Sequence, residues 1–291
     1  LWEFTDNNDA DMGYSYNLPQ INPFTGQATQ IVKMENNQWA VIVGNGYNSS
    51  GGKAVLYVLF MAGGEDGTWT VGTDYIKLVA DSGTGNGLST PTPFDKNGNG
   101  LVDVIYAGDI KGNLWKFDVS SSTPSSWNVA IGGLPLFVSG TTKPIISPPA
   151  VSFHPKKGQL IMFGTGKYLE TADTTNTSTQ SIYGLWDLNT PATITAGMLV
   201  QQVMTDATVR TATQNQVTYS DTIKGWYINL PVSGERITGV PMLEDGILLF
   251  TTIVPSASPC DFGGRGFANA LDFLTGSMLA FPAFDINRNR V

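Results

Sequence analysis

The sequence predicts an all-β fold, a modified β-propeller with long loop insertions that forms an incomplete ring in this chain. Three observations support this: a hairpin unit that recurs along the chain, a composition rich in glycine and poor in charge, and no sustained 3.6-residue periodicity. The 291 residues include 33 Gly, and 41% are hydrophobic while only 14% are charged. Such a composition is typical of many short strands joined by turns, and the missing periodicity argues against long helices.

Each predicted hairpin pairs an apolar strand with a second strand that carries a large anchor residue. The first strands are Trp39 to Gly44, Val102 to Gly108, Leu160 to Gly164 and Ile247 to Phe250. The second strands are Leu1 to Phe4, Leu56 to Leu59, Leu114 to Phe117, Leu185 to Leu188 and Ala270 to Phe273. Their anchors are Trp2, Tyr57, Trp115, Trp186 and Leu271. A fixed supersecondary unit with a drifting period predicts a propeller.

The distance between anchors grows from 55 residues, Trp2 to Tyr57, to 85 residues, Trp186 to Leu271. Insertions such as Thr171–Gln180 and Pro191–Gln216 explain the growth, and we expect them to be loops. The repeats are fewer than the six to eight blades expected, so the ring is incomplete. A two-sheet sandwich is the alternative for alternating strands, but recurrent Trp hairpins favour the propeller.

Residues 1–291 are read as one propeller domain of a longer precursor, because the chain begins at Leu1 and shows no signal peptide. The net charge is −8, and no Lys/Arg cluster forms a footprint for nucleic acid, so DNA and RNA are excluded as partners. No apolar run is long enough to span a bilayer. The single cysteine, Cys260, cannot form an internal disulfide, and it has either a partner elsewhere or a buried, inert, non-catalytic role.

The stretch from Asp95 to Asp103 predicts a calcium loop. Oxygen-bearing side chains fall at positions 1, 3, 5 and 9, glycine stands at position 6, and position 7 offers a backbone carbonyl. Calcium prefers six to eight oxygen ligands, and a loop of alternating Asx residues with a glycine turn can wrap it. The bidentate Glu of an EF-hand is replaced by Tyr106, and a strand follows instead of a helix, so the loop is not an EF-hand. The expected ligands are Asp95, Asn97, Asn99, the Leu101 carbonyl and Asp103. The alternative is a plain Asx/Gly turn.

Weaker candidates receive structural interpretations. The acidic group Asp6, Asn7, Asn8, Asp9 and Asp11 has no glycine hinge, so we expect a solvated loop rather than a second cation site. The run from Asp285 to Val291 begins like a calcium loop, but Arg288 and Arg290 would repel the ion. The single histidine, His154, is expected at the surface in a turn between strands, because a triad or a zinc site needs more partners. Two glycine clusters, at 44–46 and 164–166, lack a following helix and are expected to be strand exits.

A family resemblance runs through most of the chain, and each segment that carries it is weak alone while the ordered series is specific. The segments are 2–6, 12–16, 43–49, 163–170, 181–187, 225–231, 234–236, 259–260 and 263–264. In these segments the chain resembles the C-terminal propeller of the PilY/PilC-type type IV pilus tip proteins. The residues of the 95–103 loop match that family's calcium site, except that Asn97 stands where the family often has Asp. No Arg-Gly-Asp tripeptide is present, so integrin recognition by that motif is not carried over.

The resemblance implies a non-enzymatic protein exposed at the cell surface of a Gram-negative bacterium, at the pilus tip. Its Ca²⁺ would regulate pilus assembly, retraction and adhesion. The implied partners are minor pilins of the pilus tip complex and a host or surface receptor. Two alternatives stay open: a purely structural assembly module, and a periplasmic quinoprotein-like dehydrogenase. The second rests on residues 107–115, which resemble the Ala-x-Asp…Gly…Trp docking motif of quinoprotein propellers, where the motif is architectural.

Overall fold

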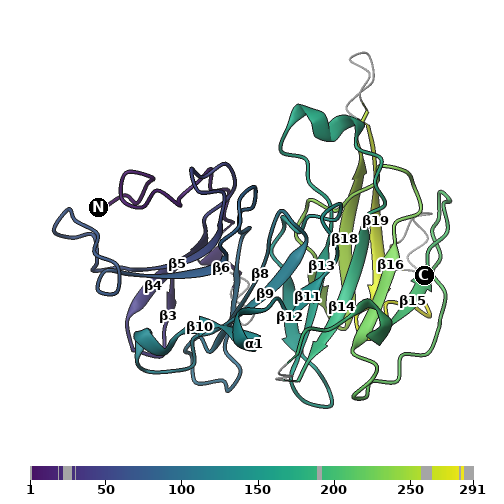
Figure 1. Cartoon of the computed structure of the whole chain (residues 1–291). Helices are drawn as coiled ribbons and strands as arrows, with labels where there is room; N and C mark the ends of the chain where they lie inside the picture. Colours follow the sequence, from purple (N-terminus) through teal and green to yellow (C-terminus); the bar gives the residue numbers. More distant parts are fainter. Residues whose placement is uncertain are drawn as a thin grey trace. The chain divides into compact units, whose positions relative to one another are not determined.

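The computed structural model describes residues 2–18, 20–21, 28–29, 31–188, 192–256, 264–281 and 283–284 (Figure 1). The chain divides into two compact units. The first is Leu1–Val151 with Asn189–Thr195, and the second is Ser152–Leu188 with Ala196–Val291. Among the described residues, helix is confined to α1 (Ala130–Gly133) and to three 3-10 turns, η1 (Pro124–Ser126), η2 (Thr171–Thr175) and η3 (Ala196–Met198). No helix in these residues is long and apolar enough to cross a membrane.

The first unit opens with a short strand pair, β1 (Gln20–Ile21) and β2 (Ala28–Thr29), followed by a four-stranded antiparallel sheet. That sheet contains β3 (Ile31–Lys33), β4 (Trp39–Gly44), β5 (Ala54–Phe60) and β6 (Tyr75–Asp81) in chain order. All seven residues of β5 are buried, because both faces of the strand are covered. Leu56 and Val58 face a core that continues into the next sheet, whereas Val55 and Tyr57 face a smaller cluster with Trp2 and other aromatic side chains.

The second sheet of this unit is built around β9. Its order is β10-β9-β8-β7, and β11 also pairs with β9. The strands are β7 (Thr92–Phe94), β8 (Val104–Gly108), β9 (Asn113–Asp118), β10 (Asn128–Val129) and β11 (Phe137–Val138). Trp115 and Phe117, two residues apart on β9, point to the same face and join the core that holds Leu56 and Val58. The two sheets are therefore joined by shared apolar packing.

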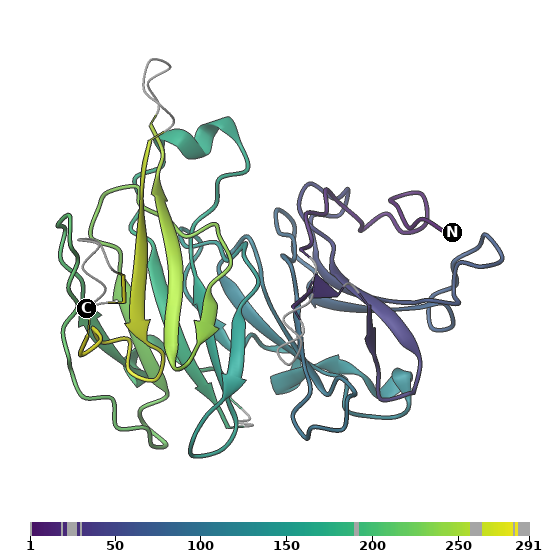
Figure 2. The same ribbon diagram turned by 180° about the vertical axis from the view of Figure 1, so that it is seen from behind.

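Two further sheets follow, and their strands belong to the second unit except for the first two residues of β12. One has the order β12-β13-β14-β16-β15 and the other the order β17-β18-β19. The long strands β18 and β19 can be followed from behind in Figure 2. The strands are β12 (Ala150–Phe153), β13 (Gln159–Gly164), β14 (Ser181–Asp187), β15 (Leu199–Val203), β16 (Gly225–Asn229), β17 (Met242–Glu244), β18 (Ile247–Val254) and β19 (Arg265–Asp272).

The predicted hairpins are confirmed. The pairs β4–β5, β8–β9, β13–β14 and β18–β19 are all antiparallel, and each contains the predicted strands with small shifts at the ends. The largest shift is at β19, which begins at Arg265 instead of Ala270. In the described part of the chain the sheets stay separate and none closes on itself, as expected for an incomplete propeller ring.

Two elements of the structure differ from the sequence prediction. Residues 2–4 form no strand, because the structure holds this segment by side chains: Trp2 lies edge-on to Trp69 at 4.9 Å between ring centroids, and Phe4 lies 5.2 Å from Tyr57. The insertion 191–216 is not entirely loop, since it contributes β15, which pairs in parallel with β16 at the edge of its sheet. A parallel partner that follows later in the chain gives no local hairpin signal.

Candidate metal centre

The predicted calcium loop lies between β7 and β8, at one end of the second sheet. Asp95 follows β7 directly, and Asp103 precedes β8. The Asp103 N–H donates to the Phe94 carbonyl at 3.1 Å, so the two ends of the loop are closed by a backbone bond. Asp103 is buried, whereas Asn97 and Asn99 are exposed at the loop tip. The loop is therefore anchored at its base and open to solvent at its tip.

The Asp95 carboxylate organises the first half of the loop. Its Oδ1 accepts the backbone N–H of Asn97 at 3.1 Å and of Gly98 at 2.7 Å, and its Oδ2 accepts that of Gly100 at 2.7 Å. Both glycines have left-handed backbones, with φ of 78° and 82°. Glycine adopts this conformation without the steric cost that a Cβ brings. The chain therefore curls around the Asp95 carboxylate.

The remaining predicted side chains continue the curl. Asn97 Oδ1 accepts the Asn99 N–H at 3.0 Å, and Asn99 Oδ1 accepts the Leu101 N–H at 2.8 Å. The Asn97 amide also donates to the Asp103 carboxylate, at 3.1 Å to Oδ1. That carboxylate accepts the Lys96 N–H at 2.6 Å as well. Direct contacts thus bring Asp95, Asn97 and Asp103 together, and successive Asx turns place Asn99 and Leu101 beside them.

Glu35, from the neighbouring sheet, lies against the loop and was not predicted. It belongs to the turn between β3 and β4, and its Oε1 accepts the Asn99 side-chain amide at 3.2 Å. Backbone pairing brings the turn there, since Val102 N–H donates to the Lys33 carbonyl at 3.0 Å. Glu35 and Asn99 are 64 positions apart, and a turn residue in an earlier repeat carries no sequence signal for this contact.

The residues present fit a hard cation by their chemistry. Two carboxylates, two side-chain amides and backbone carbonyls provide oxygen ligands of the kind that calcium prefers. In the described part of the chain, no three His, Cys, Asp or Glu side chains gather closely enough to form a metal group by themselves. An ion in this loop would therefore depend on amide and backbone oxygens in addition to Asp95 and Asp103.

The acidic group near the N-terminus is only partly a solvated loop. Asp6, Asn7 and Asn8 are exposed, as predicted, but the carboxylates of Asp9 and Asp11 turn inward. Lys77 Nζ lies 2.7 Å from Asp9 Oδ1 and 2.7 Å from Asp11 Oδ2, and Lys53 Nζ lies 2.9 Å from Asp11 Oδ2. Burial alone would raise the pKa of Asp9, but hydrogen bonds led by that from Lys77 outweigh it and lower the pKa. The ammonium groups of Lys53 and Lys77 thus balance the negative charge of the Asp9 and Asp11 carboxylates.

His154 is buried, which corrects the expected surface position, although it does lie in the turn between β12 and β13. Its ring packs 4.4 Å from Tyr219 and 4.9 Å from Trp186, between ring centroids. Nδ1 accepts the Lys156 N–H at 3.1 Å, and Nε2 has no partner among the described residues. Burial, with a smaller effect of the Lys156 charge, lowers the pKa of His154. The histidine is a core residue in an aromatic setting.

The quinoprotein-like motif is used for architecture. The buried Asp109 carboxylate accepts Trp115 Nε1 at 2.8 Å, the Asn113 backbone N–H and side chain at 2.8 Å each, and Asn86 Nδ2 at 2.9 Å. Burial raises the pKa of Asp109, and these donors oppose the rise. Asn86 also donates to Asp81, at the end of β6, at 2.8 Å. The motif therefore ties the first sheet to the second, as its resemblance predicts.

The two glycine clusters are strand exits, as predicted, because β4 ends at Gly44 and β13 ends at Gly164. A Cβ at Gly44 would lie 2.1 Å from the Ser89 carbonyl oxygen, so the close backbone approach requires glycine.

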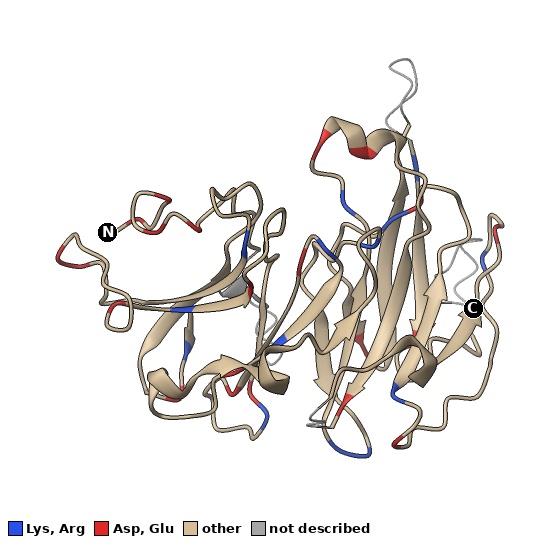
Figure 3. Cartoon of the chain, in the orientation of Figure 1, with Lys and Arg blue, Asp and Glu red and all other residues tan. Residues whose placement is uncertain are grey.

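Cys260 and the run 285–291 lie outside the described residues. Figure 3 shows Lys and Arg in blue at positions in both units.

These features define a class: a propeller domain of mainly antiparallel sheets that carries an Asx-rich candidate cation loop. Comparison with known proteins gives the family. Residues 1–220 match the family model described as the PilY1 beta-propeller domain. The chain therefore belongs to the PilY1 β-propeller family.

Curated relatives cover the chain almost completely. The type IV pilus biogenesis factor PilY1 of Pseudomonas aeruginosa PAO1 is 33% identical over 341 aligned residues, which cover 100% of this chain and 28% of the relative. A PilY1 homolog of Xylella fastidiosa Temecula1 is 34% identical, covering 95% of this chain and 20% of the relative. The chain thus spans about a quarter of the length of these relatives.

A solved structure supports the same family. The crystal structure of the Pseudomonas aeruginosa PilY1 C-terminal domain superposes with a TM-score of 0.82 at 31% identity. The superposition covers 100% of this chain and 65% of that domain. Part of that domain therefore has no counterpart in this chain.

Proposed function

We propose that this propeller domain acts in type IV pilus biogenesis at the cell surface and that its 95–103 loop binds Ca²⁺. The ion would regulate pilus assembly, retraction and adhesion, with minor pilins of the pilus tip complex and a host or surface receptor as partners. The pilus role is supported by membership in a family whose curated relatives are named type IV pilus biogenesis factors. The same names support a non-enzymatic role.

The observation that carries the calcium proposal is the curl of the loop around Asp95. Three backbone N–H groups already bind the Asp95 carboxylate, and the Asn97 and Asp103 side chains meet beside it. The Asn97 amide donates to Asp103, so an N–H dipole provides partial positive charge where a cation would be most favourable. A rotation of the Asn97 side-chain amide would present its oxygen, in place of its N–H groups, to an ion beside Asp103. Apart from this rotation, the backbone curl that an ion would need is already formed.

The expected affinity is weak. Two carboxylates and two neutral amides make a cage of low charge, and extracellular calcium modules bind more weakly than cytosolic sensors. We expect a Kd on the order of 10⁻⁵–10⁻³ M, which suits millimolar external calcium. Without the ion, the like charges of Asp95 and Asp103 repel each other, and we expect the loop to loosen while the strands stay folded.

Calorimetry on purified variants tests the site. Asp95→Ala should abolish the binding heat, because it removes a ligand and the acceptor of three loop N–H groups. The matched control is Asp66→Ala, since Asp66 also accepts a loop N–H, that of Thr68 at 2.9 Å, but lies between β5 and β6. Equal calcium heats in wild type and Asp95→Ala would place the ion elsewhere and contradict the proposal.

Two further variants refine the test. Asn97→Asp adds a third carboxylate to the loop, so calcium should bind more tightly, while the calcium-free protein should melt at a lower temperature. Glu35→Gln keeps the size of the side chain but removes its charge next to Asn99, so we expect the affinity to fall by a few-fold. Unchanged affinity in Glu35→Gln would show that the neighbouring sheet does not support the loop.

The cellular half of the proposal is tested in the full-length protein. A strain with Asp95→Ala should keep normal levels of the protein but show altered pilus number or surface motility. Wild-type piliation and motility in a strain whose protein no longer binds calcium would leave the loop with a structural role alone.

A further inference from the structure

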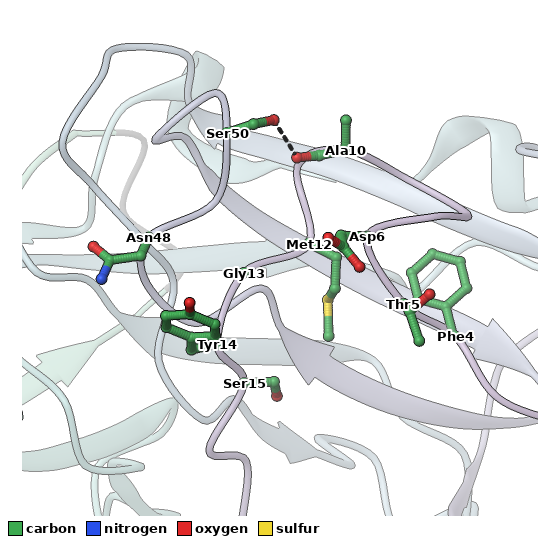
Figure 4. Close-up of a pocket in the computed structure, with 10 residues that line it drawn as sticks. All are labelled: Phe4, Thr5, Asp6, Ala10, Met12, Gly13, Tyr14, Ser15, Asn48 and Ser50. Carbon is green, nitrogen blue, oxygen red and sulfur yellow. Dashed lines mark hydrogen bonds between the residues drawn. The ribbon is translucent and has the colours of Figure 1, made fainter.

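A cavity of about 550 Å³ opens between the N-terminal segment and the loop after β4, away from the 95–103 loop (Figure 4). It is lined by residues from two segments, 4–15 and 48–50. Figure 4 shows Tyr14 and Asn48 on one side, Phe4 and Asp6 on the other, and the Met12 side chain between them. Part of the lining comes from two of the segments that carry the family resemblance, 12–16 and 43–49, which the proposed function does not use.

Hydrogen bonds and ion pairs hold the walls of this cavity in place. Tyr14 N–H donates to the Tyr47 carbonyl at 2.7 Å, and Gly13 N–H donates to the Asn45 carbonyl at 2.9 Å. Ser50 Oγ donates to the Ala10 carbonyl at 2.7 Å. The Asp9 and Asp11 ion pairs fix the same segment to the sheet below. A site whose frame is fixed in advance loses less entropy when it binds a ligand.

The residues that line the cavity combine two aromatic rings, those of Phe4 and Tyr14, with uncharged polar side chains and one carboxylate, that of Asp6. Tyr14 is 66% exposed, and it meets Tyr47 edge to face, with ring centroids 5.6 Å apart. Asn48 has a left-handed backbone, with φ of 58°, and its exposed amide lies at the rim of the cavity, on the same side as Tyr14 but pointing away from Met12 (Figure 4). Asparagine adopts this conformation more readily than most other non-glycine residues.

Charge narrows the class of ligand. The lining contains a single ionisable carboxylate, that of Asp6, and no Lys or Arg, while nearby Lys53 and Lys77 are bound to Asp9 and Asp11. An anionic ligand would therefore find no counter-charge. A purely apolar ligand would leave the amide, hydroxyl and carboxylate groups without partners, which is costly when they are covered. A neutral molecule with both C–H faces and hydroxyl groups satisfies both conditions.

We infer that this cavity binds a neutral sugar residue of a glycan, with a pyranose ring packed on Tyr14 and its hydroxyls bonded to Asn48 and Asp6. The face of an aromatic ring is negative and attracts the polarised C–H groups of a sugar. Amide and carboxylate groups provide the donors and acceptors that hydroxyls need. The inference does not depend on the calcium loop, and its test leaves that loop unchanged.

NMR tests whether the cavity binds a neutral sugar, by saturation transfer and by shifts of the backbone amide signals. The probes are methyl glucoside, methyl galactoside and N-acetylglucosamine, each added to the protein with and without calcium. At least one neutral probe should shift amides within 4–15 and 46–50, with a Kd in the millimolar range. N-acetylneuraminic acid and tetramethylammonium serve as an anionic and a cationic comparison, and neither should compete. Equal or tighter binding of either charged probe would overturn the inference, as would no shift with any neutral probe at tens of millimolar.

Variants locate the site. Tyr14→Ala should weaken binding by roughly tenfold or more, the factor that corresponds to 1.4 kcal/mol, whereas Tyr14→Phe should keep most of it. Asn48→Gly keeps the left-handed backbone and removes only the amide, so it should weaken binding while the melting temperature stays near that of wild type. Trp39→Ala is the control, because Trp39 is a 54% exposed aromatic on β4 outside the cavity. Equal losses in Tyr14→Ala and Trp39→Ala would place the sugar elsewhere.

Discussion

Replacing Trp115 by alanine should strongly destabilise the first unit. The side chain is 4% exposed and belongs to the core that joins the first and second sheets. Removing a buried aromatic side chain costs about 3–5 kcal/mol of unfolding free energy, through lost burial and the cavity left behind. Folded domains are stable by only about 5–15 kcal/mol, so this loss is a large share of the total.

The Trp115 effect has a packing part and a hydrogen-bond part. Trp115→Phe keeps most of the apolar ring but removes the Nε1–H bond of 2.8 Å to the Asp109 carboxylate. A hydrogen bond to a charged group contributes about 1.5–3 kcal/mol, and Asp109 keeps its bonds to Asn86 and Asn113. We therefore expect Trp115→Phe to cost less than Trp115→Ala. A double-mutant cycle with Asp109→Asn measures the coupling between the two side chains.

Urea unfolding followed by circular dichroism measures these free energies. Trp39→Ala is the control, since its ring is 54% exposed on β4 of the same unit and should cost little. If Trp115→Ala does not fold, Trp115→Phe still gives a measurable loss. A Trp115→Ala protein as stable as the Trp39→Ala control would show that the two sheets do not depend on this packing, and would refute the reasoning.

Two other predictions concern the second unit. The pKa of His154 is lowered in the folded state, whereas in the unfolded chain it is about 6.5. As the pH drops below about 6.5, the unfolded state therefore takes up a proton more readily than the folded state. The free energy of unfolding should fall accordingly. His154→Phe should reduce the difference in melting temperature between about pH 7.5 and about pH 5, and an unchanged difference would assign it to other groups. Arg236→Lys should lower the free energy of unfolding by about 2–4 kcal/mol. The buried guanidinium of Arg236 donates to four backbone carbonyls, among them that of Asp173 at 2.7 Å. A lysine ammonium cannot donate to the same planar set of acceptors. Hydrogen exchange should speed up in residues 167–176, whereas the exposed control Arg265→Lys should leave it unchanged; equal protection in both would contradict the role of Arg236.

The hairpins could be predicted because their signal is local. In β13–β14, for example, an apolar run stops at Gly164 and a second apolar strand carries Trp186. The 95–103 loop was predictable for the same reason, since its side chains bond to backbone groups only a few positions away. Where a residue's partners lie within one turn or one hairpin, the sequence pattern is sufficient.

The missed features depend on partners that are distant in the chain. Glu35 meets Asn99 only because two sheets pair their ends. His154 is buried by Tyr219, which comes from the long segment between β15 and β16. β15 needs a parallel partner that follows it, and no local turn marks the pairing. Such contacts follow from tertiary packing, which overrides local pattern.

The complete burial of β5 has a consequence for how the chain reaches its folded state. Ala54–Phe60 is a seven-residue stretch of apolar side chains with no charge and no proline. Segments of this kind readily stack into intermolecular sheets when they are exposed. One face of β5 is covered by residues that include Trp2 and Phe4, from the start of the chain. The early segment thus covers part of this face, and we expect a variant without Trp2 and Phe4 to expose Tyr57 and its neighbours and to aggregate more readily during refolding.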